Sequence, residues 1–485
     1  MNNESKNGLN SSKLIVLLLI VLILISGCGI SGENKSTDSV SDHTKPNAEA
    51  IIKYTGEPSR SVSLVYTTER ALSLTFNGMG DSETMMKLLD ELDAYQIKAT
   101  FFLPGIRVAE EPDIAREIVA RGHEIQNNTL NGVDLDQMNY ENIYKEIQLS
   151  QDIITKQTGI TPQYVRTKSG TYTEDVRLAA AHNGLEAVVS SSLFLHNWQD
   201  ETDIQKQHYI RKYINRGGVI AIDTEENTDL SESVHLIHEQ AELTGYKFVT
   251  LSALMDMGSE RKPLTEITGY DAAQVNPDYQ DASYDLLYRA ETSKKQVALT
   301  FDDWGTDYTI TRILDILDQY QVKASFFLRA DGVEKNPNLA RAIYEGGHDV
   351  GNHTYSHPVM TEVTPQFLQE DIVKAHQVIT EAIQAKPTMF LRPPTGDITD
   401  ETSKIAAATG YRTITVFDSD PNDWNKSNNA DDIVKSVLEQ TQNGSFILLH
   451  VLDDLETIKA LPRIIEGLQA EGYSFVRVSD LIGYQ

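Results

Sequence analysis

Cysteine is almost absent from this sequence: Cys28 is the only one among 485 residues, so no intramolecular disulfide can form. Basic residues are also scarce, because 42 Lys and Arg stand against 71 Asp and Glu, giving a formal net charge of −29. Such a surface is unsuited to nucleic acid, whose phosphates require an excess of cations. The remaining composition, 40% hydrophobic and 23% charged, is that of a globular chain long enough for two domains of about 200 residues.

The longest apolar run is short and lies at the N-terminus. Residues 14–25 follow two lysines and lead into an Ile-Ser-Gly-Cys tetrapeptide that ends at Cys28. This tetrapeptide resembles a bacterial lipobox, in which the cysteine is lipidated and becomes the new N-terminus. We expect residues 1–28 to be a lipoprotein signal peptide, with a lipid on Cys28 that anchors the protein to the outer face of the bacterial cell membrane. An uncleaved anchor that continues to Ile30 is the alternative, but a span needs about 20 apolar residues.

The residues after the lipobox are rich in Ser, Asn, Asp, Lys, Thr and Gly and have almost no large apolar side chains. Such a composition cannot bury enough apolar surface to fold. We therefore expect residues 29–57 to be a flexible tether.

The remainder of the chain is an internal repeat with a separation of about 225 residues, which indicates a duplicated domain. Five correspondences occur in the same order in both copies. They pair Leu72–Phe76 with Val297–Phe301, Ile97–Leu103 with Val322–Leu328, Gly122–Ile125 with Gly347–Val350, Arg166 and Gly170 with Arg392 and Gly396, and Asn197-Trp198 with Asp423-Trp424.

Each copy alternates short apolar strands with amphipathic helical segments, which predicts an α/β fold. In the second copy, one helical segment places Ile310, Ile313 and Leu317 largely on one face. An α/β barrel is favoured, because parallel strands need helical crossovers, and a flat doubly wound sheet is the alternative. The seven strand candidates of the second copy are Gln296–Asp302, Lys323–Leu328, Asp349–His353, Met389–Arg392, Arg412–Phe417, Ser445–Val451 and Ser474–Val478.

The expected domain boundaries follow from the repeat. Residues 58–257 form the first domain and residues 290–485 the second. The inter-domain segment, residues 258–289, carries several tyrosines and leucines that are too apolar for a free linker. We expect this segment to pack on one or both domains.

Unusual polar clusters in the second copy all fall at the carboxyl ends of predicted strands, where reactive residues of α/β folds gather. Any one cluster is weak evidence, but five in order are strong. The clusters are Thr300–Asp303, Asn352–Pro358, Arg392–Gly396, Asp420–Trp424 and Ile447–His450.

On these motifs the second copy resembles the polysaccharide deacetylases of carbohydrate esterase family four, the NodB-homology domain. The resemblance covers nearly all of residues 290–485. It implies two tandem distorted (β/α)7 barrel-like domains, with a degenerate first copy.

The residue types in these clusters also suit metal-assisted hydrolysis. The imidazoles of His353 and His357, four residues apart, and the Asp303 carboxylate form a three-ligand set for a divalent metal. Zn²⁺ is the first candidate, and Co²⁺ or another transition metal is the alternative. A bound divalent ion would activate water and polarise an acetyl carbonyl. Asp302 is then free to act as general base, and His450 is the candidate general acid.

Further residues are expected to support these groups. Asp423 would orient His450, and Arg392 would keep Asp302 ionised. Leu448 lies two residues before His450 and faces the same pocket, against the acetyl methyl group. The family resemblance further implies that the backbone N–H of Thr395 binds the oxyanion. Trp424 is expected to contact the substrate.

Two positions depart from the family pattern: Trp304 follows the two aspartates where the family has Gly, and Thr395 stands where an aromatic residue is usual. Each site residue also has a structural interpretation as a helix cap, a core residue or a surface ion pair, and only the combination favours function. His348 has a counterpart in His123, so we expect a structural role for both.

The first copy lacks the reactive residues of the second. Asn77 and Gly78 replace the two aspartates, and Asn128 and Gly132 replace the two histidines. Asn197 and Asp223 stand at the positions of Asp423 and His450. We therefore expect residues 58–257 to be catalytically inactive and to serve as a spacer or glycan-binding domain.

The sequence thus predicts removal of N-acetyl groups from a cell-envelope polysaccharide, with peptidoglycan as the first candidate, because Asp420–Trp424 is similar to a motif of peptidoglycan deacetylases. Chitin oligomers, an exopolysaccharide or O-acetyl esters on xylan are alternative substrates. A catalytically inactive glycan-binding lipoprotein is the alternative function. A glycosidase would instead need two carboxylates across a sugar.

Overall fold

The computed structural model describes residues 51–195, 201–227 and 230–484, and residues from 51 onward form one compact unit. The predicted signal peptide with Cys28, most of the predicted tether and the Asn197-Trp198 pair lie outside the described residues. Within the described residues, no helix is both long and apolar enough to cross a membrane.

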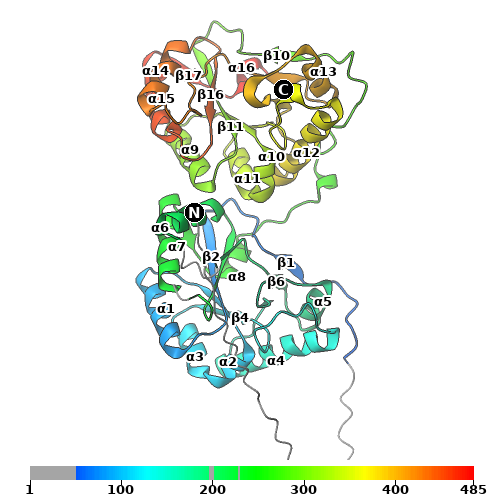
Figure 1. Cartoon of the computed structure of the whole chain (residues 1–485), viewed down its shortest axis with the longest axis vertical. Helices are drawn as coiled ribbons and strands as arrows, with labels where there is room; N and C mark the ends of the chain where they lie inside the picture. Colours follow the sequence, from blue (N-terminus) through cyan, green and yellow to red (C-terminus); the bar gives the residue numbers. More distant parts are fainter. Residues whose placement is uncertain (1–50, 196–200, 228–229, 485) are drawn as a thin grey trace, which may run out of the picture. The chain divides into compact units, whose positions relative to one another are not determined.

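A curled parallel sheet forms the centre of the first repeat, the first barrel (Figure 1). Its strand order is β1-β6-β5-β4-β3-β2-β8-β7, and β9 pairs with β2. Its elements are β1 (Arg60–Val62), β2 (Ala71–Asn77), α1 (Ser82–Ala94), β3 (Thr100–Leu103), α2 (Gly105–Glu110), α3 (Pro112–Ala120), β4 (Glu124–Asn127), α4 (Tyr140–Thr158), β5 (Tyr164–Val165), α5 (Glu174–His182), β6 (Ala187–Val189), β7 (Leu193–Leu195), α6 (Asp203–Tyr213), β8 (Gly218–Asp223), α7 (Leu230–Thr244), β9 (Lys247–Phe248) and α8 (Leu251–Asp256).

The second repeat, the second barrel, has the strand order β10-β15-β14-β13-β12-β11-β16, and β17 pairs with β11. Its elements, after a short 3-10 helix η1 (Leu264–Glu266), are β10 (Asp285–Leu287), β11 (Gln296–Asp303), α9 (Asp307–Gln319), β12 (Ser325–Leu328), α10 (Ala330–Lys335), α11 (Pro337–Glu345), β13 (Asp349–Asn352), η2 (Met360–Glu362), α12 (Pro365–Ile383), β14 (Phe390–Leu391), η3 (Pro394–Gly396), α13 (Asp400–Ala408), β15 (Thr413–Thr415), α14 (Ala430–Gln440), β16 (Phe446–His450), α15 (Thr457–Ala470), β17 (Ser474–Phe475) and α16 (Val478–Ile482).

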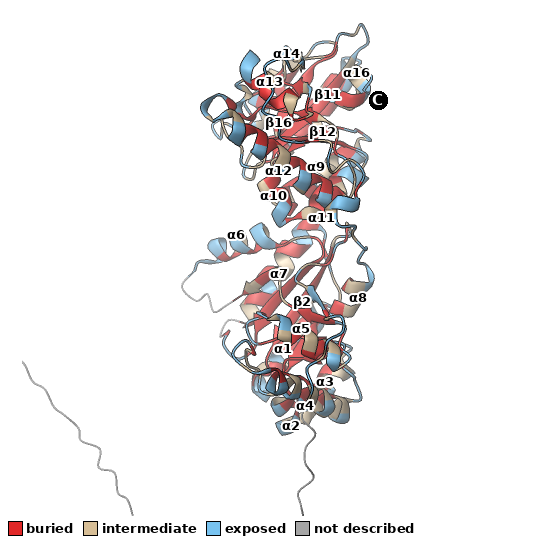
Figure 2. Ribbon diagram, turned by 90° about the vertical axis from the view of Figure 1, so that its right-hand side faces the viewer, coloured by how far each residue is buried: buried red, intermediate tan, exposed pale blue. Residues whose placement is uncertain are grey.

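The seven predicted strands of the second copy all occur, as β11 to β17, and the α/β barrel-like class is confirmed. The strand pairings within both sheets are parallel, so both faces of each sheet lie under helices or side chains of the core. Figure 2 shows the result: buried residues concentrate on the strands, and exposed residues on the outer faces of the helices. An additional strand, β10, pairs with β15 and lies in the segment that the sequence assigns between the domains.

Helix α9 shows how the sequence positions the elements beside the second barrel's strand ends. The side chain of Thr306 caps its N-terminus by accepting a hydrogen bond from the Thr309 N–H. Ile310, Ile313 and Leu317 are fully buried, as their helical spacing predicts. The cap therefore fixes where the chain turns, three residues after β11 ends.

Two segments outside the barrels pack against them. Ala273 is buried in a cluster of the second barrel that also includes the partly buried Tyr279 and Tyr284, so the inter-domain segment packs against this domain. Near the other end, Tyr54 lies against the first barrel and its N–H donates to the Tyr140 hydroxyl. Residues 51–57, which the sequence assigns to the tether, thus include contacts with the first barrel.

His123 and His348 have the same structural role in the two barrels, as their correspondence predicts. Each accepts a hydrogen bond at Nδ1 from the backbone N–H of the residue that precedes a strand, from Ala99 before β3 at 3.2 Å and from Ala324 before β12 at 3.1 Å. Burial lowers the pKa of each imidazole to about 4, so both rings are neutral.

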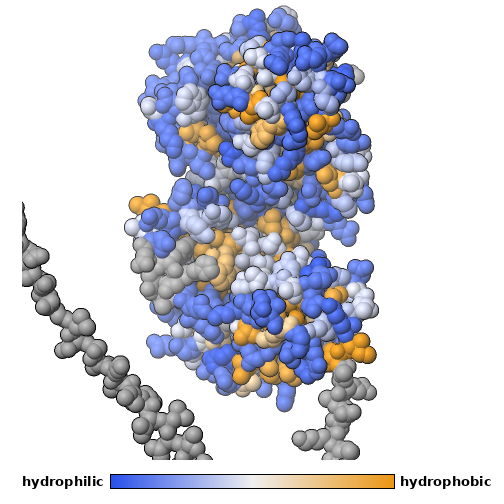
Figure 3. Space-filling model, turned by 45° about the vertical axis from the view of Figure 1, so that its right-hand side comes forward, coloured by the Kyte–Doolittle hydropathy of each residue, from blue (hydrophilic) through white to orange (hydrophobic). Residues whose placement is uncertain are grey.

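The surface matches the acidic, polar composition. Hydrophilic residues cover most of the face seen in Figure 3, and hydrophobic residues form small patches between them. Scattered apolar residues of this kind are normal on a soluble surface.

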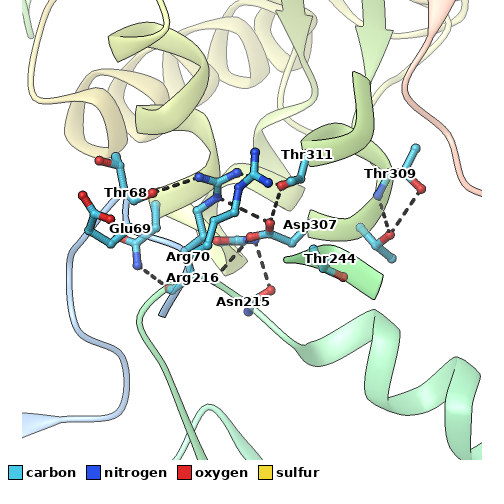
Figure 4. Close-up of polar contacts among 12 residues, drawn as sticks. Thr68, Glu69, Arg70, Asn215, Arg216, Thr244, Asp307, Thr309 and Thr311 are labelled. Carbon is cyan, nitrogen blue, oxygen red and sulfur yellow. Dashed lines mark hydrogen bonds and ion pairs between the residues drawn. The ribbon is translucent and has the colours of Figure 1, made fainter. Parts of the chain in front are cut away.

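Buried polar contacts join the two barrels (Figure 4). Asp307, at the start of α9, accepts hydrogen bonds from the backbone N–H of Arg216 at 3.3 Å and from the Thr311 hydroxyl at 2.8 Å. The Arg216 guanidinium lies 3.4 Å from the same carboxylate and donates to the Thr68 carbonyl. Arg70 and Asp315 form a second ion pair, which is partly exposed. The first barrel is therefore bound to the helix that follows the two aspartates of the second.

Candidate active site

Three potential metal ligands converge at the strand ends of the second barrel. One ligand atom from each of Asp303, His353 and His357 lies within 4.8 Å of the others, and the His357 Nε2 is 3.5 Å from the Asp303 Oδ1. Asp303 ends β11, and the two histidines lie in the loop after β13. The parallel pairing of β11, β12 and β13 brings these strand ends to one edge.

The backbone at these ligands is unusual. Asp303, Thr354 and His357 have positive φ angles of 78°, 65° and 59°, in a region that residues other than glycine rarely adopt. Such conformations cost free energy and persist only where the surroundings impose them. Here the Asn352 side chain accepts from the Thr354 N–H at 2.7 Å and donates to the Ile372 carbonyl. The loop is thereby fixed in the shape that brings both imidazoles to Asp303.

Asp371, on α12, also holds this loop and was not identified from the sequence. Its carboxylate accepts hydrogen bonds from the backbone N–H groups of Tyr355 and Ser356, at 2.7 Å and 3.1 Å, and from the Ser356 hydroxyl. A signal was present, because Asp371 lies in the apolar stripe of its helix between Leu368 and Ala375. A carboxylate on a buried helix face needs a polar partner.

The His353 ring is oriented for ligation through one nitrogen. Its Nδ1 is 2.8 Å from the Arg392 carbonyl oxygen, which can only accept, so Nδ1 carries the proton and Nε2 has a free lone pair. Burial lowers the pKa of His353 to about 3, which keeps the imidazole neutral. A neutral histidine is the form that binds a metal.

One carboxylate and two imidazoles fit a divalent transition metal by number and type of donor. In the described parts of the chain, this is the only group of three or more His, Cys, Asp or Glu ligands within such a distance. The candidate metal group is therefore confined to the second barrel.

Asp302 lies beside the ligands but is held by a different partner. The Arg392 guanidinium donates to both of its oxygens, at 3.0 Å and 3.2 Å, and both side chains are buried. Burial raises the pKa of Asp302, and the Arg392 charge opposes that rise. Arg392 is itself fixed by the Thr415 carbonyl and by the Phe327 ring, whose centroid is 4.3 Å from the guanidinium carbon.

His450 lies opposite Asp302 on the neighbouring strand and is paired with Asp423. Its Nδ1 is 2.7 Å from the Asp423 Oδ1, and its backbone N–H donates to the other carboxylate oxygen. Burial lowers the pKa of His450, but the hydrogen bond and charge of Asp423, together with Asp302 and Asp303, raise it to about 9. The imidazole is thus held in its protonated form at neutral pH.

The three predicted substrate contacts lie on elements that border this centre. Leu448 is buried on β16, two residues before His450. Thr395 is exposed in η3 with a φ of 61°, and Trp424 is 52% exposed directly after Asp423. The sequence did not indicate the position of Trp304: its ring packs so closely on α10 that a Cβ on Gly332 would lie 2.1 Å from it.

The first barrel keeps the framework of this centre without its reactive groups. Arg166 is fully buried and donates to the Asn77 side chain, as Arg392 does to Asp302. Asn128 donates to the Arg166 carbonyl at 2.8 Å, as the His353 ring does to that of Arg392. Gly78 and Gly132 have φ angles of 79° and 64°, close to those of Asp303 and His357.

Comparison with known proteins gives matches to both barrels. A family model described as Polysaccharide deacetylase matches residues 65–188 and 289–414, more than half of the chain. A peptidoglycan-N-acetylglucosamine deacetylase of Bacillus cereus is 35% identical over 204 residues, which are 41% of this chain and 94% of that protein. A peptidoglycan-N-acetylglucosamine deacetylase of Listeria monocytogenes is 32% identical over 214 residues, 44% of this chain and 44% of that protein.

Among solved structures, a CE4 family pseudoenzyme from Bacillus anthracis is 32% identical. It covers 42% of this chain and 70% of its own, with a TM-score of 0.39. Similar proteins thus include both enzymes and a pseudoenzyme.

Proposed function

Because the chain belongs to the polysaccharide deacetylase family, we propose that its second barrel hydrolyses N-acetyl groups of a cell-envelope polysaccharide, with peptidoglycan as the substrate. The observation that carries this proposal is the convergence of three units: the Asp303–His353–His357 group, the Asp302–Arg392 pair and the His450–Asp423 pair. Together they provide a metal site, a base and an acid.

The reaction adds water to the acetyl carbonyl carbon and breaks the C–N bond, giving acetate and a free amine. Asp303, His353 and His357 would hold a divalent ion, which when bound would supply Lewis-acid polarisation of the carbonyl. Asp302 accepts the proton of the attacking water, a role that suits a buried carboxylate whose pKa lies above its ordinary value. His450, protonated at neutral pH, donates a proton from Nε2 to the leaving nitrogen.

The remaining residues position these groups. Asp423 holds the His450 ring, and Arg392 fixes the Asp302 carboxylate between strands. The Thr395 N–H would bind the developing oxyanion, while Leu448 contacts the acetyl methyl group and Trp424 contacts the sugar. Zn²⁺ is the metal we propose, because a set of two imidazoles and one carboxylate is typical of catalytic zinc.

Peptidoglycan is supported by the similarity to peptidoglycan-N-acetylglucosamine deacetylases and by the predicted lipid anchor on Cys28, which would hold the enzyme beside the cell wall. We also propose that the first barrel is catalytically inactive. Asn77, Gly78, Asn128 and Gly132 occupy the base and ligand positions and offer no carboxylate or imidazole.

Acetate release by the full chain tests the proposed function. Peptidoglycan, chitin oligomers and acetylated xylan are incubated with the protein, with and without a chelator. Chelator-sensitive release from peptidoglycan is expected. Faster release from xylan would reassign the enzyme to O-acetyl esters, and no release from any substrate would favour an inactive glycan-binding protein.

A further inference from the structure

A groove of about 570 Å³ lies where the two barrels meet, with walls from both. Lys212, Tyr213 and Asn215 of the first barrel face Trp304, Lys335 and Asp453 of the second across this groove. Ligand sites occur preferentially at such junctions between domains, lined by aromatic side chains and a few polar groups.

The groove continues from the catalytic loops of the second barrel. Trp304 directly follows the metal-ligand position Asp303, and Asp453 lies three residues after His450. The Asp453 carboxylate accepts hydrogen bonds from the N–H and hydroxyl of Thr306, which ties these two loops together. The groove is therefore bordered by the residues that follow Asp303 and His450 in the sequence.

Helix α6 gives the first-barrel wall an aromatic surface. Tyr213 is 37% exposed and its ring lies 4.7 Å from that of Tyr209. Most of α6 is exposed at its outer side (Figure 2). Trp304 provides a partly buried ring on the opposite wall. Rigid aromatic rings offer flat apolar contact area at a low cost in conformational entropy, which suits the flat C–H faces of sugar rings.

Basic and acidic residues both line the groove. Lys212, Arg329 and Lys335 stand there beside Asp307, Glu334 and Asp453. Lys212 and Lys335 are exposed, and no ion pair of either ammonium group occurs among the described residues, so both can donate hydrogen bonds to a polar ligand.

We propose that this groove is a distal subsite for the glycan strand. Tyr213 and Trp304 contact sugar rings, and Lys212 and Lys335 donate hydrogen bonds to polar groups of the strand. The proposal rests on the deacetylase function of the second barrel and gives the first barrel a role in substrate binding. It also implies a preference for long strands over short ones.

The test compares substrates that do or do not reach the groove. Tyr213→Ala and Lys212→Ala are made in the full chain, and acetate release is measured on long peptidoglycan glycan strands and on a chitin disaccharide. Each change is expected to raise KM for the long strands about threefold to tenfold, as loss of one ring or charge contact implies. Both kcat and the kinetics of the disaccharide should stay within about twofold of the unchanged protein.

Two matched variants serve as controls. Tyr172 is as exposed as Tyr213, at 37%, but lies in the first barrel away from the groove, and Lys435 lies exposed on α14. Tyr172→Ala and Lys435→Ala should leave KM for the long strands unchanged. A rise with Tyr172→Ala but not with Tyr213→Ala would place the glycan elsewhere on the first barrel and overturn the proposal, as would equal effects on long and short substrates.

A binding measurement distinguishes failure of the groove proposal from failure of the proposed deacetylase function. If the unchanged protein releases no acetate, the deacetylase function fails. Long strands are therefore also titrated calorimetrically against the Asp302→Asn chain, with and without Tyr213→Ala. Weaker binding by about threefold to tenfold with Tyr213→Ala supports the groove without any turnover. Equal affinities overturn it.

Discussion

His450 and Asp423 form a two-point contact: one carboxylate oxygen is 2.7 Å from the ring Nδ1, while the other accepts the backbone N–H of His450 at 2.8 Å. The second oxygen also accepts the Thr457 hydroxyl. Ring and backbone are thus held by the same group, which fixes both the direction of Nε2 and the charge of the imidazole.

The pH dependence of kcat/KM should show the effect of Asp423 on the pKa of His450. The protonated His450 is the active form, so activity falls as the pH rises through its pKa of about 9. In Asp423→Asn the burial of the His450 ring is no longer offset by the Asp423 carboxylate, and Asp302 and Asp303 offset it only in part, so the pKa of His450 falls. The alkaline limb of kcat/KM should therefore move to lower pH by at least about one unit.

Thr457→Val is the control, because it removes one hydrogen bond from Asp423 and leaves the charge in place. Its alkaline limb should move far less. An unchanged limb in Asp423→Asn would show that His450 is not the group whose deprotonation limits the reaction.

Substitution of Asp302 and of Asp303 should distinguish the general base from a metal ligand. Asp302→Asn is expected to lower kcat by about 10² to 10⁴-fold while the protein keeps its metal, because general-base catalysis contributes that much and the other three residues remain. Asp303→Asn should lose metal and activity together. Metal content by plasma mass spectrometry, beside acetate release, distinguishes them. Loss of metal from Asp302→Asn would show that Asp302 is a metal ligand and would leave Asp303 as the candidate base.

The first barrel should contribute no turnover of its own. In the full chain, His353→Ala combined with His357→Ala removes two of the three candidate ligands. Acetate release should fall to background, because Asn128 and Gly132 stand at these positions in the first barrel. Asn128→Ala, as the matched change there, should keep full activity. Residual chelator-sensitive release in the double variant would show a second active site.

The contact between the barrels should dominate the stability of their junction. The side chain of Asp307 is fully buried and that of Arg216 is 6% exposed, so Arg216→Ala leaves a buried carboxylate without its charge partner. We expect a loss of about 3–5 kcal/mol in unfolding free energy. Denaturant unfolding measures it.

Arg70→Ala provides the comparison, because the Arg70–Asp315 pair is about one-third exposed on both sides. Solvent screening should limit its effect to about 1 kcal/mol or less. A larger loss from Arg70→Ala than from Arg216→Ala would mean that the exposed pair, and not the buried one, holds the junction.

The left-handed backbone at His357 predicts a difference between two substitutions that both remove the ligand. His357→Gly should be more stable than His357→Ala by about 1 kcal/mol in the metal-free protein, because glycine adopts a φ of 59° without the steric cost. Thermal unfolding with chelator present checks it. Ser356, which is exposed and has no positive φ, serves as the control. Ser356→Gly should be no more stable than Ser356→Ala.

The sequence predicted the parts of this protein that depend on local pattern. Strand β11 and the buried face of α9 follow from apolar periodicity, and the polar residues after each strand indicated the site because parallel strands end at one edge. Contacts between distant segments were not predictable in this way. The place of Asp371 in the apolar stripe of α12 indicates that it needs a polar partner but does not identify the loop that it holds. Asp307 is predicted only as a helix-start residue, because Arg216, which contacts it, lies 91 positions away.

Gly78 and Gly132 repeat the backbone of Asp303 and His357 with nearly the same φ angles, and this makes the two barrels unequal in evolutionary terms. Replacing Asp303 or His357 by glycine would relieve this backbone strain, so loss of either ligand would favour folding. The reverse changes at Gly78 and Gly132 would add strain, and only a bound metal could offset it. At these two positions, folding therefore favours losing a ligand over gaining one.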